Sequence, residues 1–449
     1  MRTTIGIRTA GAARLGAAVV GAALAATAAC GDDLVPAGAA GDEVDPGPIA
    51  CATAWRDRQL GTALDDRLLG MAVDARGRVV VAGFERGVTG VTNLEPDGDA
   101  RGVLIGLAED GAPAWRLELD TPATDTLDDV ARAPDTGALY AIGRTTGTLA
   151  GFTNAGQVDG VVLAVDAAGA PVGRLQFGDE RPQHPARLAL GDHALAIAGY
   201  DDTYIPSNYV EAWEDGFVAR LTRDGGAAPL ALTDLRKEPN PSANRITGVA
   251  IDRGGELYVT ASATGSRARA GAFVRRLAAD GSARWSVRLS AVPIDVATAI
   301  AIAPTGEVIV AGATVAALGG PGLGGQDVFV AALDPATGDR LWLRQLGSDA
   351  SEIPSAIAID AGGRIYVAGQ TLGGVRGAPR GGLDAFAIVL DADGAERGRW
   401  QAGTAADDVA TAIAIDGCGR VVVGGYTRGE LVAGSAHGGD DLFVMRAAL

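Results

Sequence analysis

A short apolar segment recurs seven times along this chain at an almost constant spacing. Each copy follows a loop that contains glycine or an acidic residue, and successive copies begin 58, 56, 56, 56, 57 and 57 residues apart. The copies begin at Arg101, Asp159, Asp215, Gly271, Asp327, Asp384 and Asp441. Repeats of about fifty residues are typical of propellers and solenoids, in which each unit buries its apolar faces against its neighbours. The spacing therefore predicts seven equivalent structural units.

The sixth copy shows what one unit contains. Its sequence predicts strands over 355–360, 364–369 and 384–390 and a fourth strand from Arg399 onward, with no segment of helical periodicity. Glycine-containing turns join the first two strands and the last two, as tight hairpins require. Four short antiparallel strands make one propeller blade. We therefore expect an all-β fold, a seven-bladed β-propeller of four-stranded antiparallel blades.

The last three copies share a more specific motif. They contain GG-x-D-x-F-V and L-D-x-x-G, then a tryptophan, A-I-A-I-D-x-x-G and Y-V-x-G, seen best in 324–371 and 381–394. These features resemble the seven-bladed propeller repeat of bacterial surface proteins, abbreviated SBBP. The resemblance extends over 54–449 and weakens in copies two to four, where Ala261 replaces the glycine. It implies a surface protein, and it implies no catalytic residues because that family has none established.

The two ends of the repeat region complete each other. The last copy stops after its third strand, whereas residues 54–60 have the Trp and Arg-Gln-Leu of a fourth strand and precede any first strand. We expect 54–60 to be the outer strand of the last blade, which closes the ring and covers an exposed edge.

The cysteines support the same geometry. Cys51 lies just before this strand, and Cys418 lies in a turn on the same face. A disulfide between them would lock the N-terminal strand in place, and an exported pair is usually bridged. The bond requires Cys51 to fold back across two strand spacings of about 4.8 Å each, because Cα atoms more than about 7 Å apart do not bridge.

The first thirty residues have the pattern of an export signal. Three arginines precede a short apolar run over 15–26, which ends in small residues before Cys30. A cysteine at this place resembles the lipobox of bacterial lipoproteins, with Thr27 where that family prefers Leu. We expect 1–29 to be a signal peptide, Cys30 to carry a lipid, 30–50 to be a flexible acidic tether and 51–449 to be the propeller.

Two features are candidates for binding. Acidic residues precede the innermost strand in several copies, so they either form a cation-binding or basic-partner face or accept backbone N–H bonds at strand starts. Those residues are Asp65, Asp66, Asp128, Asp129, Asp295, Glu352, Asp407 and Asp408. The long segment 200–215 carries Tyr204, Tyr209 and Trp213, which either form a recognition patch or fold down over their own loop. Five other tryptophans begin the predicted fourth strands and are expected to pack between blades: Trp55, Trp115, Trp285, Trp342 and Trp400.

The composition narrows the class of partner. The formal net charge of −17 argues against nucleic acid, which needs clustered Lys and Arg. The three histidines lie in separate copies, so we expect no catalytic residue, metal or cofactor. The leading hypothesis is a monomeric, lipid-anchored propeller of the cell envelope that binds a protein or glycan through its top-face loops. The alternatives are an enzyme, a hydrolase or lyase with a carboxylate site in the central channel, and a purely structural surface component.

Overall fold

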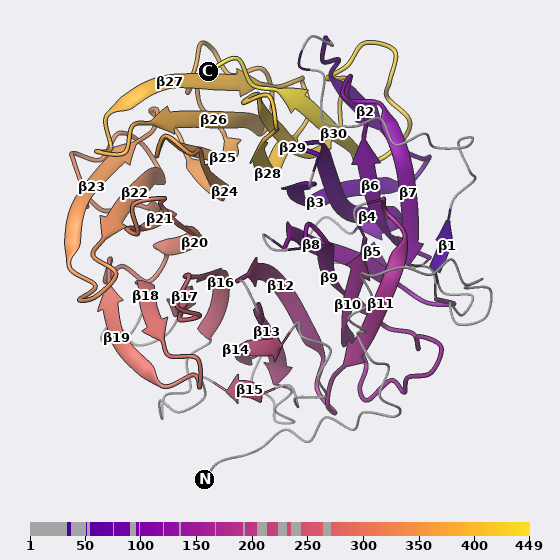
Figure 1. The fold of residues 1–449 in the computed structure, drawn as a ribbon. Coiled ribbons are helices and arrows are strands. Elements are labelled where there is room, and N and C mark those ends of the chain that lie inside the picture. Colours follow the sequence, from indigo (N-terminus) through magenta and orange to yellow (C-terminus); the bar gives the residue numbers. More distant parts are fainter. Residues whose placement is uncertain are drawn as a thin grey trace, which may run out of the picture.

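The computed structural model of this protein describes residues 34–36, 51, 54–74, 76–89, 96–97, 99–119, 121–133, 136–166, 168–191, 194–203, 213–222, 231–234, 244–263 and 271–449. Strands and connecting loops make up this part of the chain, with no helix in it. The strands form seven antiparallel blades arranged in a ring around a central channel (Figure 1). The predicted seven-bladed β-propeller is confirmed.

Each blade has its innermost strand first and its outermost strand last. Blade 1 contains β3 (Asp65–Val73), β4 (Val79–Thr89), β6 (Arg101–Leu107) and β7 (Pro113–Leu119). Blade 2 contains β8 (Asp125–Arg132), β9 (Leu139–Thr145), β10 (Asp159–Val165) and β11 (Pro171–Phe177). Blade 3 contains β12 (Gln183–Leu190), β13 (Ala194–Thr203), β14 (Trp213–Thr222) and β15 (Ala231–Asp234). Blade 4 contains β16 (Asn244–Ile251), β17 (Leu257–Ala263), β18 (Gly271–Leu277) and β19 (Ala283–Arg288).

The remaining blades follow the same order. Blade 5 contains β20 (Val296–Ile302), β21 (Val308–Thr314), β22 (Asp327–Leu333) and β23 (Arg340–Leu346). Blade 6 contains β24 (Glu352–Ile359), β25 (Ile365–Thr371), β26 (Asp384–Leu390) and β27 (Glu396–Ala402). Blade 7 contains β28 (Asp408–Ile415), β29 (Val421–Thr427), β30 (Asp441–Arg446) and β2 (Arg58–Leu60). Two short strands lie outside this scheme: β1 (Leu34–Pro36) pairs with β7, and β5 (Pro96–Asp97) pairs with β4.

The ring is closed as the sequence predicts. Strand β2 pairs antiparallel with β30, with Arg58 opposite Val444 and Leu60 opposite Leu442. The paired segment is shorter than the expected 54–60. In blade 6 the fourth strand begins at Glu396, earlier than the predicted Arg399, because the hairpin turn ends directly before it.

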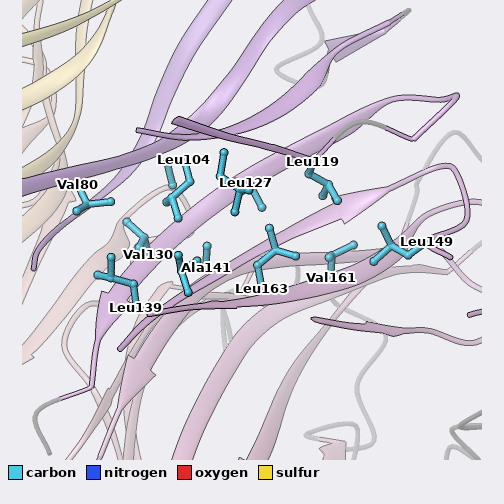
Figure 2. Close-up of a cluster of buried hydrophobic side chains, with 13 residues drawn as sticks. Val80, Leu104, Leu119, Leu127, Val130, Leu139, Ala141, Leu149, Val161 and Leu163 are labelled. Atoms are coloured by element: carbon cyan, nitrogen blue, oxygen red, sulfur yellow. The ribbon is translucent and has the colours of Figure 1, made fainter. Parts of the chain in front are cut away.

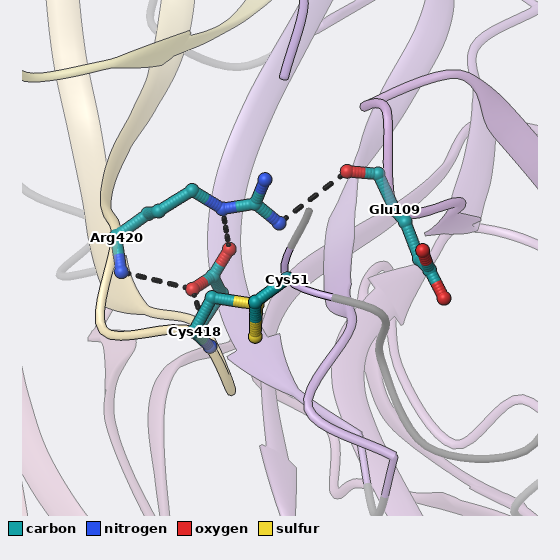
Figure 3. Close-up of a disulfide and its surroundings, with 5 residues drawn as sticks. Cys51, Glu109, Cys418 and Arg420 are labelled. Atoms are coloured by element: carbon teal, nitrogen blue, oxygen red, sulfur yellow. Dashed lines mark hydrogen bonds and ion pairs between the residues drawn. A yellow bond between two sulfur atoms is a disulfide. The ribbon is translucent and has the colours of Figure 1, made fainter. Parts of the chain in front are cut away.

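The predicted Cys51–Cys418 disulfide is present, with the two Cα atoms 5.5 Å apart. Figure 3 shows it beside Arg420, whose guanidinium Nε donates to Asp416 at 2.5 Å and whose Nη2 donates to the carbonyl oxygen of Glu109 in blade 1 at 3.3 Å. The backbone N–H of Cys418 also donates to Asp416. The Cys51–Cys418 disulfide thus joins the N-terminal segment to the first turn of blade 7, close to the boundary with blade 1. Because disulfides persist in oxidising compartments, it indicates a location outside the cytoplasm.

A β-bulge interrupts every innermost strand at the same place. In blade 6, for example, Pro354 lies opposite Gly369 and Ala356 lies opposite Ala368, so Ser355 has no partner on β25. The bulge moves a carbonyl toward the second strand: a Cβ on Gly369 would lie 2.1 Å from the carbonyl oxygen of Ile353. This contact explains the glycine of the repeated Y-V-x-G motif, since any side chain there would collide with the backbone.

Apolar residues fill the space between neighbouring blades. Figure 2 shows the cluster between blades 1 and 2, where Leu104 and Leu119 face Leu127, Leu139 and other buried side chains. A tryptophan at the outer edge extends this packing: a Cβ on Gly394, in the blade 6 hairpin, would lie 2.9 Å from the Trp342 ring of blade 5. The expected packing role holds for Trp55, Trp115, Trp285 and Trp342. Trp400 also packs between blades, in the buried cluster that joins blade 6 to blade 7, but it lies further along its strand, and Gly398 occupies the position of the other tryptophans.

Candidate functional site

The acidic residues of the top face, the face at which the innermost strands begin, serve the fold. Asp408 accepts the backbone N–H of Thr404 and the hydroxyl of Thr427. Asp384, at the start of β26, accepts the backbone N–H of Arg380 at 3.0 Å and the side-chain amide of Gln401 at 2.6 Å. The same pattern recurs at Asp66, Asp125, Asp159, Asp327, Glu352 and Asp441. Of the two interpretations of these carboxylates, the structure therefore supports backbone acceptance.

Burial alters the proton affinity of these carboxyl groups. Loss of hydration raises the pKa of Asp66 to about 6, against the lowering effect of the N–H groups of Thr62 and Arg86. It also raises the pKa of Asp159 and that of Asp408. Within the described ranges, no group of three or more His, Cys, Asp or Glu residues could hold a metal ion.

The predicted aromatic patch is only partly within the described structure. Tyr204, Tyr209 and the proposed lipidation site Cys30 lie outside the described residues. Trp213 is the first residue of β14, where its backbone pairs with Thr203. Strands β13 and β14 thus meet the top face at Thr203 and Trp213, and residues 204–212 between them lie outside the described residues.

The neighbouring Tyr200 packs against other side chains. Its ring stacks on His184 with centroids 4.7 Å apart, and the guanidinium of Arg245 lies 4.3 Å from its centroid. This aromatic residue at the base of the hairpin is therefore a packing residue.

Exposed apolar side chains concentrate on the top face. Nine large ones are exposed among the described residues, and six of them lie on this face. The six are Leu64, Val88, Ile294, Val315, Leu323 and Leu372. Four of these, which we call the apolar patch, belong to loops of blades 5 and 6: Ile294, Val315, Leu323 and Leu372, with 59%, 41%, 45% and 53% of their surfaces exposed.

The same loop positions carry polar residues in other blades. Val315 directly follows the last residue of β21, and its N–H donates to Asp295, which places it beside Ile294. In blade 7 the two corresponding residues are Asp407 and Arg428, which lie 4.0 Å apart as an ion pair. Since the fold accepts charged residues at these positions, the apolar side chains of blades 5 and 6 are not required by the architecture.

The central channel contains a cavity of about 200 Å³. All seven innermost strands line it at the level of their bulges. The residue after the bulge is small in five blades: Gly70, Gly248, Ala299, Ala356 and Ala412. In blades 2 and 3 this position carries Asp129 and Arg187, the two charged residues of the described lining.

These two residues lie on adjacent strands. Asp129 accepts the backbone N–H of Leu188 and its neighbouring N–H of Val130, both at 2.9 Å. Burial raises the pKa of Asp129 to about 6, although the charge of Arg187 and these two N–H groups favour its ionised form. This carboxyl group therefore keeps its proton to a higher pH than an exposed aspartate does.

The sequence alone did not single out this pair. Asp129 is one of the acids expected before an innermost strand, whereas the structure places it within β8, and no motif marks Arg187. Their position in the repeat is the sequence feature that could identify them. An alignment of the seven copies places a charged residue in two adjacent blades where the other five have Gly or Ala.

Comparisons with known proteins leave the family open. No family model matches the chain, and no curated protein matches it. A protein of unknown function from Dyadobacter fermentans is 14% identical with a TM-score of 0.47, over 87% of this chain and 99% of that one. YCF48 bound to a D1 peptide is 14% identical with a TM-score of 0.46, over 88% and 96%. A putative 6-phosphogluconolactonase from Bacteroides fragilis is 12% identical with a TM-score of 0.46, over 79% and 92%. At these identities and TM-scores, the likenesses assign no activity, ligand or partner to this chain.

Proposed function

We propose that this chain is an extracytoplasmic binding propeller, held at the membrane by a lipid on Cys30, whose top face recognises a protein partner. The export signal, the lipobox-like cysteine and the SBBP-like motifs support a place on the bacterial envelope. The disulfide supports an oxidising compartment. No helix in the described ranges is long and apolar enough to cross a membrane.

The apolar patch is the observation that carries the proposal. An excess of exposed apolar side chains on one face of a folded protein indicates an interaction site, and six of the nine exposed among the described residues lie on the top face. The patch lies on the face at which β13 ends and β14 begins, the two strands that flank the segment with Tyr204 and Tyr209 in the sequence, and the patch residues belong to loops of a rigid ring. An acidic protein does not favour an anionic lipid surface as the occupant. Aliphatic side chains therefore favour a protein partner, and a glycan is the alternative outcome of the test.

The channel lining favours binding over hydrolysis by paired carboxylates. Glycoside hydrolysis by that route needs two carboxyl groups flanking the bond, and Asp129 is the one carboxylate among the described lining residues. Its neighbour in the lining is a cation.

A capture experiment with matched variants tests the proposed surface. Mature protein is used to isolate partners from an envelope extract, beside Ile294→Ser/Leu372→Ser and the control Val172→Ser. Val172 is 57% exposed at the outer edge of blade 2, so its loss should change nothing on the top face. We expect a protein that the wild type and the control retain and the double variant loses. Equal capture by all three, or recovery of glycan alone, would contradict the proposal.

Two further variants test the sequence-derived parts. Cys30→Ala should release the protein in soluble form, because the acyl chains supply the membrane affinity. Mass spectrometry that finds an unmodified N-terminus at another residue would exclude the anchor.

Replacing Tyr204, Tyr209 and Trp213 together with Ser should abolish capture and leave the unfolding midpoint nearly unchanged. A large loss of stability would show that these rings are packing residues.

A further inference from the structure

The guanidinium of Arg187 is held across the central channel with part of its hydrogen-bonding capacity unused. Arg187 projects from β12 in blade 3, and its Nη2 lies 3.5 Å from the carbonyl oxygen of Ser355 in blade 6, on the opposite side of the ring (Figure 1). Its Nη1 donates to the carbonyl oxygen of Ala186 at 2.8 Å. A guanidinium has five N–H donors, and these two are the hydrogen bonds that it makes among the described residues. The bond to the carbonyl oxygen of Ser355 is at the outer limit of bonding distance.

The nearby carboxylate does not use the remaining donors. Both oxygens of Asp129 already accept backbone N–H groups, one from Val130 and one from Leu188. The Asp129 side chain lies against the backbone of blade 1, since a Cβ on Gly70 would be 2.8 Å from its Oδ1. The side-chain hydrogen-bonding groups still available in the channel are therefore the positively charged N–H donors of Arg187.

The other side chains of the wall are mostly apolar, but polar atoms supply more of the surface that the cavity exposes than carbon atoms do. Apart from Asp129, Arg187, Ser355 and Thr411, the described lining residues are Gly, Ala, Val, Leu, Ile and Met. The hydroxyl of Thr411 is itself bonded to the carbonyl oxygen of Leu68 at 2.5 Å. A cavity of about 200 Å³ in which a guanidinium keeps unused N–H donors has the make-up of a site for a small carboxylate.

We propose that the central channel binds a small monocarboxylate, whose carboxylate pairs with Arg187. Guanidinium and carboxylate match in shape, and the pair forms two parallel charge-assisted bonds. The site is separate from the apolar patch, so either can fail without the other.

Asp129 makes this binding depend on pH. The charged groups near Asp129 are Arg187 from β12 and Asp128 on its own strand, while β3 presents the backbone at Gly70. A second carboxylate beside Arg187 disfavours the ionised form of Asp129, so ligand binding near pH 7 takes up a proton. Affinity therefore increases as the pH falls from 8 to 6.

Calorimetric titration of the purified mature protein with hexanoate and with hexanamide tests the proposal. We expect hexanoate to bind at least tenfold more tightly than hexanamide, and Arg187→Met to abolish this preference. The control is Arg344→Met, because Arg344 also donates to the carbonyl of its preceding residue and to a carbonyl in another blade, far from the channel. Equal binding of the two probes, or no binding of carboxylates from butyrate to decanoate, would overturn the proposal.

A second variant keeps the test informative if Arg187→Met does not fold. Asp129→Asn removes the negative charge beside Arg187, so it should bind hexanoate at least threefold more tightly at pH 8. Titrations in buffers of different ionisation enthalpy should show proton uptake in the wild type and none in this variant. Weaker binding by Asp129→Asn, or proton uptake unchanged by it, would contradict the assignment.

Discussion

The outer strands of blade 5 and blade 7 make the same side-chain bonds, although one follows its neighbour in the chain and the other comes from the opposite end of it. In blade 5, Gln345 donates to Asp327 at 2.7 Å across 18 residues of sequence. In blade 7, Gln59 donates to Asp441 at 2.8 Å across 382 residues. Both glutamine side-chain oxygens accept backbone N–H groups of the adjacent loop. A blade thus requires particular contacts and does not require that its strands be consecutive.

Blades 5 and 7 differ in what holds the outer strand in place. Strand β23 has seven residues, whereas β2 has three. The composite blade 7 adds the disulfide, and it adds an ion pair between Arg58 and Asp110 of blade 1 at 3.3 Å. Joining distant segments of the chain costs loop-closure entropy. The disulfide offsets this cost in blade 7, whose four strands are not consecutive in the sequence.

The largest expected effect comes from removing that link. Cys51→Ala/Cys418→Ala opens a loop with a sequence separation of 367, and the chain-entropy model gives a loss of stability on the order of 5 kcal/mol. Urea unfolding measures the loss, and reduced wild-type protein should match the double variant. A midpoint that neither reduction nor substitution changes would show that blade 7 needs no covalent closure.

Two tryptophans allow the boundary where the ring closes, between blades 7 and 1, to be compared with the boundary between blades 5 and 6. Trp342 packs on the Gly394 turn of the next blade, and Trp55 packs in the same way on the Gly111 turn of blade 1. Because both rings are partly buried, replacing either with Ala should cost about 2 to 3 kcal/mol, below the range for fully buried rings. Calorimetry of Trp55→Ala and Trp342→Ala would detect this. A negligible cost for Trp55→Ala alone would mean that the boundary between blades 7 and 1 is packed less well than that between blades 5 and 6.

The glutamines give the most closely matched pair. Gln59→Ala and Gln345→Ala each leave a buried aspartate without its side-chain donor, so each should cost about 1 to 3 kcal/mol. The two losses in unfolding free energy should agree within error if the blades are equivalent. A much larger loss for Gln59→Ala would indicate that detachment of β2, and not the lost bonds, sets the cost.

The smallest expected effect concerns pH. Asp66 lies at the boundary between blades 7 and 1, and burial raises its pKa to about 6, well above the ordinary value of an aspartate. Between about pH 4 and pH 6 the carboxyl group of Asp66 is protonated in the folded state and ionised in the unfolded state. This difference in bound protons stabilises the fold at pH 4, and the contribution is lost as the pH rises through 6. The melting temperature of Asp66→Asn should fall less than that of the wild type between pH 4.5 and 7.5. Asp349→Asn, an exposed acid of the same face, is the control, and a wild-type-like pH dependence of Asp66→Asn would refute the assignment.

The sequence predicted the features that repeat. The constant spacing of the copies gave the number of blades, and the Trp and Arg-Gln-Leu of residues 54–60 gave the ring closure. The repeat did not reveal the bulge on each innermost strand, because a bulge adds one residue without changing the apolar pattern of its strand. The lining of the channel depends on that bulge, so Arg187 could not be placed there from its neighbours in sequence.

Amide hydrogen exchange at β2 tests the closed ring most directly. Residues 58–60 should be protected in the oxidised protein to the same degree as β27, the outer strand of blade 6, because both make backbone bonds to a buried third strand. Deleting residues 51–60 should remove the protection of the β30 amides that face β2 and leave that of β26 and β27 intact. Unprotected amides at 58–60, together with a fully protected β30, would contradict the account.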